Sequence, residues 1–123
     1  MDLGAFSISL TVKDIGASRA FYETLGFAQV GGDIDQNWLI LRNGAATIGL
    51  FQGMFDGNIL TFNPGWSGEE KPAGDFEDVR AIQARLKAAG IALTQETDPE
   101  GTGPAHIALT DPDGNAILID QHV

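Results

Sequence analysis

The sequence contains no cysteine and only two histidines among its 123 residues. Without cysteine, the chain has no disulfides, no thiolate metal ligands and no cysteine nucleophile. With two histidines, a metal centre would have to take most of its ligands from carboxylates. These absences exclude several kinds of site before any motif is considered.

Basic residues are also scarce. Seven Lys and Arg stand against 17 Asp and Glu, which gives a formal net charge of −10. Seven basic side chains can neutralise only a few phosphates, so we do not expect a nucleic-acid partner. The negative net charge opposes docking on anionic lipid, so we do not expect a membrane partner either. The chain has no apolar run of membrane-spanning length, and its first residues do not resemble a secretory leader. We therefore expect a cytoplasmic protein of one domain.

What the sequence does contain is an internal repeat. Residues 14–27 and residues 78–91 align without a gap, each beginning with Asp and carrying Gly in the last position but one. Asp is a good N-cap because its carboxylate accepts the unpaired N–H groups of the first helical turn, and Gly favours the left-handed turn after the last one. Each segment is predicted to form one helix, and the matching caps favour a duplicated unit.

Strand patterns surround both helices in the same order. In the first half they cover residues 7–12, 27–30, 37–42 and 47–51, with a hairpin signal at Asn43-Gly44. In the second half they cover residues 59–63, 91–96, 105–110 and 116–121, the last two joined by the strong turn signal of residues 111–115. The charged, Gly/Pro-rich residues 64–74 are predicted to be a loop. Glu69, Glu70 and Asp75 are predicted to be solvated charges.

The fold class predicted from this order is α+β. Residues 1–123 form a single domain of two βαβββ modules, residues 1–53 and residues 54–123. One helix cannot cover the sheet of its own module, so the two modules are expected to share one core.

Alternation within the strands separates two faces. One is predicted to be a continuous apolar face beneath the helices, made of Ile8, Leu10, Val12, Ile48, Leu50, Leu60, Phe62, Ile107, Leu109, Ile117 and Ile119. The opposite face mixes small polar, aromatic and charged side chains. Because antiparallel sheets often leave one face in water, this mixed face is either exposed sheet or the lining of a cleft.

Several short motifs together resemble the vicinal oxygen chelate superfamily, the group of glyoxalase I, the extradiol dioxygenases and the bleomycin-resistance proteins. They are Val12-Lys13-Asp14, Ser18, Phe21-Tyr22, Leu25-Gly26-Phe27 and the turn at residues 111–115. The resemblance covers nearly the whole chain. It implies a curved, half-barrel mixed sheet with the helices on its convex face, a ligand in the concave cleft, and a homodimer. It therefore favours the cleft interpretation of the mixed face.

Metal-dependent members of the superfamily hold a divalent ion with His and Glu side chains from four strands. The matching positions in this chain are Ser7, Gly49, a residue within 57–59, and Leu118. A divalent catalytic site needs several imidazole or carboxylate donors around one point, and these positions do not supply them. We therefore predict no metal and no other cofactor, and the superfamily's Lewis-acid and dioxygen chemistry does not transfer to this chain.

One acid–base pair is predicted on the mixed face. If the turn at residues 111–115 is centred on Asp113, His106 lies opposite Asp120 on the neighbouring strand. A carboxylate there favours the imidazolium or fixes one tautomer, so His106 and Asp120 are either candidate catalytic residues or a structural polar pair. His122 is expected to face the other way and to be a surface residue.

The remaining candidates are ligand contacts. Trp38 and Phe51, with Trp66 from the loop, could form an aromatic clamp for a flat ligand, although large aromatics on a sheet also serve packing alone. The full set of candidate ligand-binding residues is Ser7, Ser9, Trp38, Thr47, Phe51, Thr61, Asn63, Trp66 and Leu118.

These predictions favour a metal-free, glyoxalase/bleomycin-resistance-like protein that binds a small organic molecule rather than an enzyme. Two enzymatic alternatives stay open. One is a metal-independent lyase or isomerase that uses His106 and Asp120 for proton transfer. The other is a glyoxalase- or dioxygenase-like metalloenzyme whose ligands have moved to other positions. A purely structural or regulatory partner protein is a further alternative.

Overall fold

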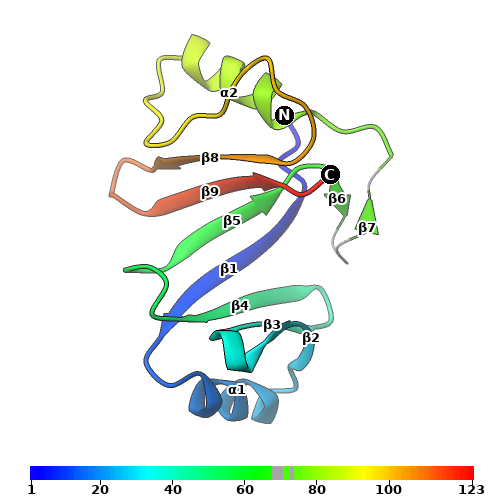
Figure 1. The fold of residues 1–123 in the computed structure, drawn as a ribbon, viewed down its shortest axis with the longest axis vertical. Helices are drawn as coiled ribbons and strands as arrows, with labels where there is room; N and C mark the ends of the chain where they lie inside the picture. Colours follow the sequence, from blue (N-terminus) through cyan, green and yellow to red (C-terminus); the bar gives the residue numbers. More distant parts are fainter. Residues whose placement is uncertain (68–70, 73) are drawn as a thin grey trace. The chain divides into compact units, whose positions relative to one another are not determined.

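The computed structural model describes residues 1–67, 71–72 and 74–123 (Figure 1). Its helices are α1 (Ile15–Thr24), the 3-10 helix η1 (Ile34–Gln36) and α2 (Val79–Ala88). Its strands are β1 (Ala5–Val12), β2 (Ala28–Asp33), β3 (Trp38–Asn43), β4 (Ala46–Gln52), β5 (Ile59–Asn63), β6 (Trp66–Ser67), β7 (Lys71–Pro72), β8 (Ala105–Thr110) and β9 (Ala116–Gln121). The predicted α+β class is confirmed. Neither α1 nor α2, the α-helices of the described chain, has the length and apolarity needed to cross a bilayer.

The main sheet has the strand order β2-β3-β4-β1-β5-β9-β8, while β6 pairs with β7. The chain divides into two compact units, and β1 contributes residues to both. The terminal unit comprises Met1–Phe6 and Leu60–Val123, and the inner unit comprises Ser7–Ile59.

The inner unit is built around the β3–β4 hairpin. The turn predicted at Asn43-Gly44 is formed, with Gly44 at φ 56°, a backbone region that glycine enters without strain. Strand β1 runs parallel to β4, and β2 runs antiparallel to β3. Helix α1 begins after Asp14, whose carboxylate accepts the N–H of Ala17, and packs against β4. The core of the unit consists of Ile15, Leu39, Leu41, Ile48 and Leu50.

The terminal unit is built around the β8–β9 hairpin. Its register is the predicted one, with Ile107 opposite Ile119. The carboxylate of Asp111 holds the turn by accepting hydrogen bonds from the backbone N–H groups of Asp113 and Asn115 and from the Asn115 amide. These bonds, above all those from Asn115, hold the pKa of Asp111 below its ordinary value. Helix α2 packs against this hairpin, and the core consists of Val79, Ile82, Ile107, Leu109 and Ile119.

A glutamine at the end of one strand binds the first turn of the helix in each unit. Gln52 ends β4, and its Oε1 accepts the N–H of Ile15 at 2.9 Å. Gln121 ends β9, and its Oε1 accepts the N–H of Val79 at 2.7 Å. Both acceptors satisfy an N–H group that has no partner inside the helix. The Gln121 side chain is almost fully buried, and its Nε2 also donates to Asp78 Oδ2, Gly103 O and Val123 O.

The strand predicted over residues 91–96 is wrong. In the part of the chain that the structure describes, this segment makes a single bridge, between Gln95 and Ala108 of β8. At the end of this segment, side chains of helix α2 bind Glu96 and Thr97. The Gln83 amide donates to the carbonyl of Thr97 at 2.9 Å and accepts its N–H at 2.8 Å, and Lys87 lies 2.6 Å from Glu96. The segment therefore turns onto α2 instead of continuing along β8.

The loop predicted over residues 64–74 contains a short antiparallel pair. Trp66 lies opposite Pro72, and Ser67 lies opposite Lys71. Glu69 and Glu70, predicted as solvated charges, lie outside the described residues.

The prediction that the two modules share one core is wrong, because the buried apolar residues form two clusters. The predicted apolar-face residues of β1 and β4 belong to the core cluster of the inner unit, and those of β8 and β9 belong to the cluster of the terminal unit. Among the described residues, neither cluster includes Leu60 or Phe62. Phe62 packs instead against Phe6, with ring centroids 5.1 Å apart, and Phe6 is 49% exposed. Each helix therefore covers a core of its own.

Candidate functional site

An aromatic row crosses the mixed face of the inner unit. The β3–β4 register places Trp38 opposite Phe51. Their rings are stacked nearly parallel, at 11°, with centroids 6.5 Å apart. Phe55 continues the row with its ring tilted on Phe51, at a centroid distance of 5.3 Å. Trp38 and Phe51 are half-buried, so this row offers a flat apolar surface beside polar strand residues.

Gly49 lies directly beneath the Phe51 ring. A Cβ at position 49 would be 2.5 Å from Phe51 Cε2, and 3.4 Å from Ile40 Cδ1. A larger side chain at this position would displace the aromatic ring. The ring therefore occupies the space into which a side chain at position 49 would extend.

Polar candidates of the inner unit lie on the same face. Ser9 is paired in register with Gly49 and is 7% exposed, whereas Ser7 is half-buried. The Thr47 hydroxyl accepts a hydrogen bond from Arg42 Nε at 3.1 Å. The structure thus brings Ser9, Thr47, Trp38 and Phe51 together on one side of β1, β3 and β4.

In the terminal unit, the polar candidates are largely buried. Thr61 is 7% exposed and Asn63 is 8% exposed, while Leu118 is half-buried. The Asn63 side chain donates through Nδ2 to the carbonyl of Asp120 at 2.8 Å and so holds β5 to β9. This contact gives Asn63 a structural role in addition to its predicted role as a ligand contact.

His106 lies opposite Asp120, as the register predicted. The carboxylate of Asp120, however, contacts another histidine: its Oδ2 is 3.3 Å from Nε2 of His122. The imidazole of His122 also stacks on Trp66, with ring centroids 4.4 Å apart and planes at 12°.

The prediction that His122 faces away from Asp120 is therefore wrong. Residues two apart on a strand point to the same side, so the spacing from Asp120 to His122 was the signal that could have found this contact. Of the residues predicted to form an aromatic clamp, Trp38 stacks on Phe51 in the inner unit, and Trp66 stacks on His122 in the terminal unit.

The residues at the superfamily's metal-ligand positions do not fit a metal. Ser7, Gly49 and Leu118 offer no imidazole or carboxylate, and at Gly49 the Phe51 ring also fills the space of a longer side chain. Within the described ranges, no group of three or more His, Asp or Glu side chains is placed to hold a metal ion. What the mixed face of the inner unit can do chemically is stack on a flat molecule and hydrogen-bond to it through hydroxyl groups.

Comparison with known proteins agrees with this architecture. A family model of the Glyoxalase/Bleomycin resistance protein/Dioxygenase superfamily matches residues 4–119. The chain belongs to this superfamily. The resemblance inferred from the short motifs is therefore confirmed. A comparison with curated proteins found no match.

Solved structures of superfamily members share the fold at low sequence identity. A glyoxalase/bleomycin resistance protein/dioxygenase superfamily member from Vibrio splendidus 12B01 aligns with a TM-score of 0.65 at 18% identity, covering 94% of this chain and 97% of that one. Methylmalonyl-CoA epimerase from Mycobacterium tuberculosis aligns with a TM-score of 0.66 at 19% identity, covering 100% and 91%. An extradiol ring-cleaving dioxygenase from B. fuscum aligns with a TM-score of 0.62 at 19% identity, covering 99% of this chain and 33% of that one.

Proposed function

We propose that this superfamily member is a metal-independent binding protein that holds a small, flat organic molecule against Trp38 and Phe51. The observation that carries the proposal is the placement of the Phe51 ring over Gly49, where it stacks on Trp38. At this position the chain has an aromatic surface in place of a chelating carboxylate. An aromatic surface binds by stacking, which needs no metal.

The polar residues around the row would orient the ligand. Ser9 and Thr47 lie on the same side of the sheet as Trp38, and their hydroxyl groups are both donors and acceptors. Ligand pockets typically combine an apolar lining with a few such polar groups. Ser7 from the inner unit, and Thr61, Asn63, Trp66 and Leu118 from the terminal unit, remain predicted contacts. A homodimer and a cytoplasmic location are also part of this proposal.

A second candidate is a metal-independent enzyme, which a specific contact favours. Asp120 lies 3.3 Å from His122, and a carboxylate that orients an imidazole is a common arrangement for proton transfer. In such an enzyme the general base would be His122 rather than His106. We then expect a bound molecule to be slowly converted, and we expect the conversion to be abolished in His122→Ala but not in His106→Ala.

The test uses the fact that the chain has two tryptophans. In a Trp66→Phe variant, Trp38 is the remaining indole, and its fluorescence is titrated with a panel of planar aromatic molecules after dialysis against a chelator. We expect saturable quenching, and an affinity about tenfold lower in Phe51→Ala, since a well-packed aromatic pair contributes about 0.5–1.5 kcal/mol beyond its burial. The matched control is Phe21→Ala, which removes a ring of the same unit that is 62% exposed on α1.

Two outcomes would contradict the binding proposal. One is a stoichiometric metal in the purified protein together with loss of all binding after chelation. The other is an equal loss of affinity in Phe51→Ala and Phe21→Ala. Following the bound molecule by NMR over hours distinguishes the enzyme from the binding protein, because only the enzyme yields a product.

A further inference from the structure

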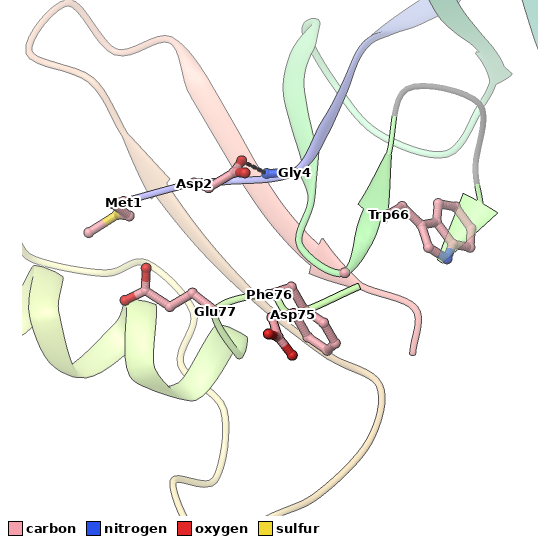
Figure 2. Close-up of a pocket in the computed structure, with 8 residues that line it drawn as sticks. Met1, Asp2, Gly4, Trp66, Asp75, Phe76 and Glu77 are labelled. Carbon is pink, nitrogen blue, oxygen red and sulfur yellow. Dashed lines mark hydrogen bonds between the residues drawn. The ribbon is translucent and has the colours of Figure 1, made fainter. Parts of the chain in front are cut away.

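A cavity lies in the terminal unit, close to the N-terminus of helix α2. It has a volume of about 400 Å³, which suits a molecule with a single ring. Its lining is formed by Met1, Asp2, Gly4, Gly65, Trp66, Asp75, Phe76 and Glu77, whose side chains are shown in Figure 2. The residues come from the N-terminal segment, from the start of β6 and from the segment that leads into α2.

Two glycines shape the backbone of this cavity. Gly4 and Gly65 have φ angles of +79° and +88°, a region in which other residues are strained. A Cβ on Gly65 would lie 3.2 Å from the Phe76 ring and 2.4 Å from Val123 Cγ2. The Phe76 ring therefore packs directly on the Gly65 backbone, which fixes this ring as a wall of the cavity.

Trp66 and Phe76 supply aromatic surface to the cavity. The Trp66 indole is held from one side by the stacked imidazole of His122 at 4.4 Å. Phe76 is 43% exposed although it is large and apolar, so part of its ring is available to a ligand. Aromatic faces attract organic cations, because the ring quadrupole presents negative charge above its plane.

The charged side chains that line the cavity among the described residues are all acidic. Asp2 accepts the N–H of Gly4 through Oδ1 at 2.8 Å, which orients its carboxylate (Figure 2). Glu77 is paired through Oε1 with Arg85 at 2.9 Å and is 19% exposed. Asp75 is exposed. The cavity thus combines aromatic rings with three carboxylates, and both features attract an organic cation, against the single α-ammonium group of Met1 in the same lining.

We propose that this cavity binds a small organic ammonium ion that carries one aromatic or apolar group. The apolar group would pack against Phe76 and Trp66, and the ammonium would face Asp2 and Asp75. The site lies in the terminal unit and involves neither Trp38 nor Phe51; it shares Trp66 with the predicted contacts named above.

The test is isothermal titration calorimetry of the full chain with 2-phenylethylammonium chloride. A Trp38→Phe background leaves Trp66 as the single indole, whose N–H signal is followed by NMR. We expect saturable binding that shifts this signal and weakens in added salt. The neutral isostere 2-phenylethanol should bind at least about fivefold more weakly, and phenylacetate more weakly still.

Variants then assign the contacts. Phe76→Ala should weaken ammonium binding about tenfold, and Asp75→Asn about threefold, as expected for a partly exposed aromatic wall and an exposed carboxylate. The matched control for Asp75→Asn is Glu100→Gln, which removes one negative charge from an exposed residue of the same unit outside the cavity. The backbone NMR spectrum of each variant verifies its fold.

The proposal is overturned by equal affinity for the ammonium ion and the alcohol, or by an unshifted Trp66 signal at saturation. It is also overturned if Glu100→Gln weakens binding as much as Asp75→Asn does, since the ion would then respond to net charge alone. Failure of these tests leaves the Trp38–Phe51 proposal unaffected, because that surface is assayed with Trp66 removed.

Discussion

The inner and terminal units hold their helices by equivalent contacts, but they differ in whether a strand follows the helix. In both, an Asp N-cap starts a ten-residue helix, and a Gln at the end of a strand binds the first N–H of that helix. In the inner unit, β2 then pairs with β3 along its length, whereas residues 91–96 make one bridge to β8. The units therefore share the contacts that hold the helix and differ in the strand that follows it.

The difference shows what decides whether the outer strand forms. In the terminal unit, Gln83 and Lys87 of α2 bind Thr97 and Glu96. The backbone of Thr97 is thus satisfied by the helix rather than by a neighbouring strand. The duplicated order of elements sets the position of the helix, and side chains on the helix surface decide the path of the segment after it.

The largest expected effect tests whether the cores of the two units contribute equally to the free energy of unfolding. Leu41 in the inner unit and Ile107 in the terminal unit are fully buried. Leu41→Ala and Ile107→Ala should each lower the free energy of unfolding by about 2–5 kcal/mol, through lost apolar burial and the cavity left behind. Urea denaturation measures the change. The control is Leu25→Ala, where the side chain is 56% exposed and the expected loss is below about 1 kcal/mol.

A smaller loss of stability is expected when the glutamine that binds the first turn of each helix is replaced. Gln121→Leu should cost about 2–3 kcal/mol, because it leaves the buried Val79 N–H without its acceptor and removes the hydrogen bonds from Gln121 Nε2 to Asp78, Gly103 and Val123. Gln52→Leu, which removes the acceptor of the Ile15 N–H, should cost about 1 kcal/mol. We expect the larger loss of stability for Gln121→Leu because Gln121 is 1% exposed, whereas Gln52 is half-buried. Thermal and urea unfolding of both variants provide the comparison. Equal losses would mean that the additional hydrogen bonds of Gln121 contribute nothing.

The smallest expected effect concerns acid stability. Burial works to raise the pKa of Asp78, but hydrogen bonds from the Arg80 N–H and from the Gln121 and Arg80 side chains outweigh it and lower this pKa below its ordinary value of 3.8. A carboxyl with a depressed folded-state pKa stabilises the protein above its unfolded-state pKa, and this contribution is lost as pH falls through the folded-state value.

The free energy of unfolding should fall as the pH is lowered from neutral to below the folded-state pKa of Asp78. This fall should be smaller in Asp78→Asn, which has no carboxyl at that position. Urea midpoints at the two pH values measure this, with Asp14→Asn as the counterpart cap of the inner unit. An unchanged pH dependence in Asp78→Asn would mean that the Asp78 carboxylate contributes nothing to the loss of stability in acid.

Local signals in the sequence predicted much of the fold. Asp14 and Asp78 were identified as caps, and the β8–β9 register followed from a turn of five residues, because caps and tight turns depend on neighbouring residues. The error over residues 91–96 has a tertiary cause. The alternating pattern suits a strand, but Gln83 lies on a helix that precedes this segment in the sequence, and no pattern within the segment reveals its contact with Thr97.

The candidate site was predicted less completely. Position along the strands placed Gly49 and Phe51 on one face, but side-chain torsion angles decide that the ring lies over the glycine. The contact between Asp120 and His122 was available from their spacing and was missed. Gln52 and Gln121 were missed for a physical reason, since a polar amide is usually exposed and only the completed fold buries it.

The Phe51 ring over Gly49 also constrains the order in which these two positions can change. A carboxylate or imidazole introduced at 49 meets the ring at once, so residue 51 has to become small beforehand. That earlier change deprives Trp38 of its stacked neighbour. The intermediate in which only residue 51 has changed would neither stack nor chelate, so a stepwise exchange of stacking for chelation passes through a protein that does neither.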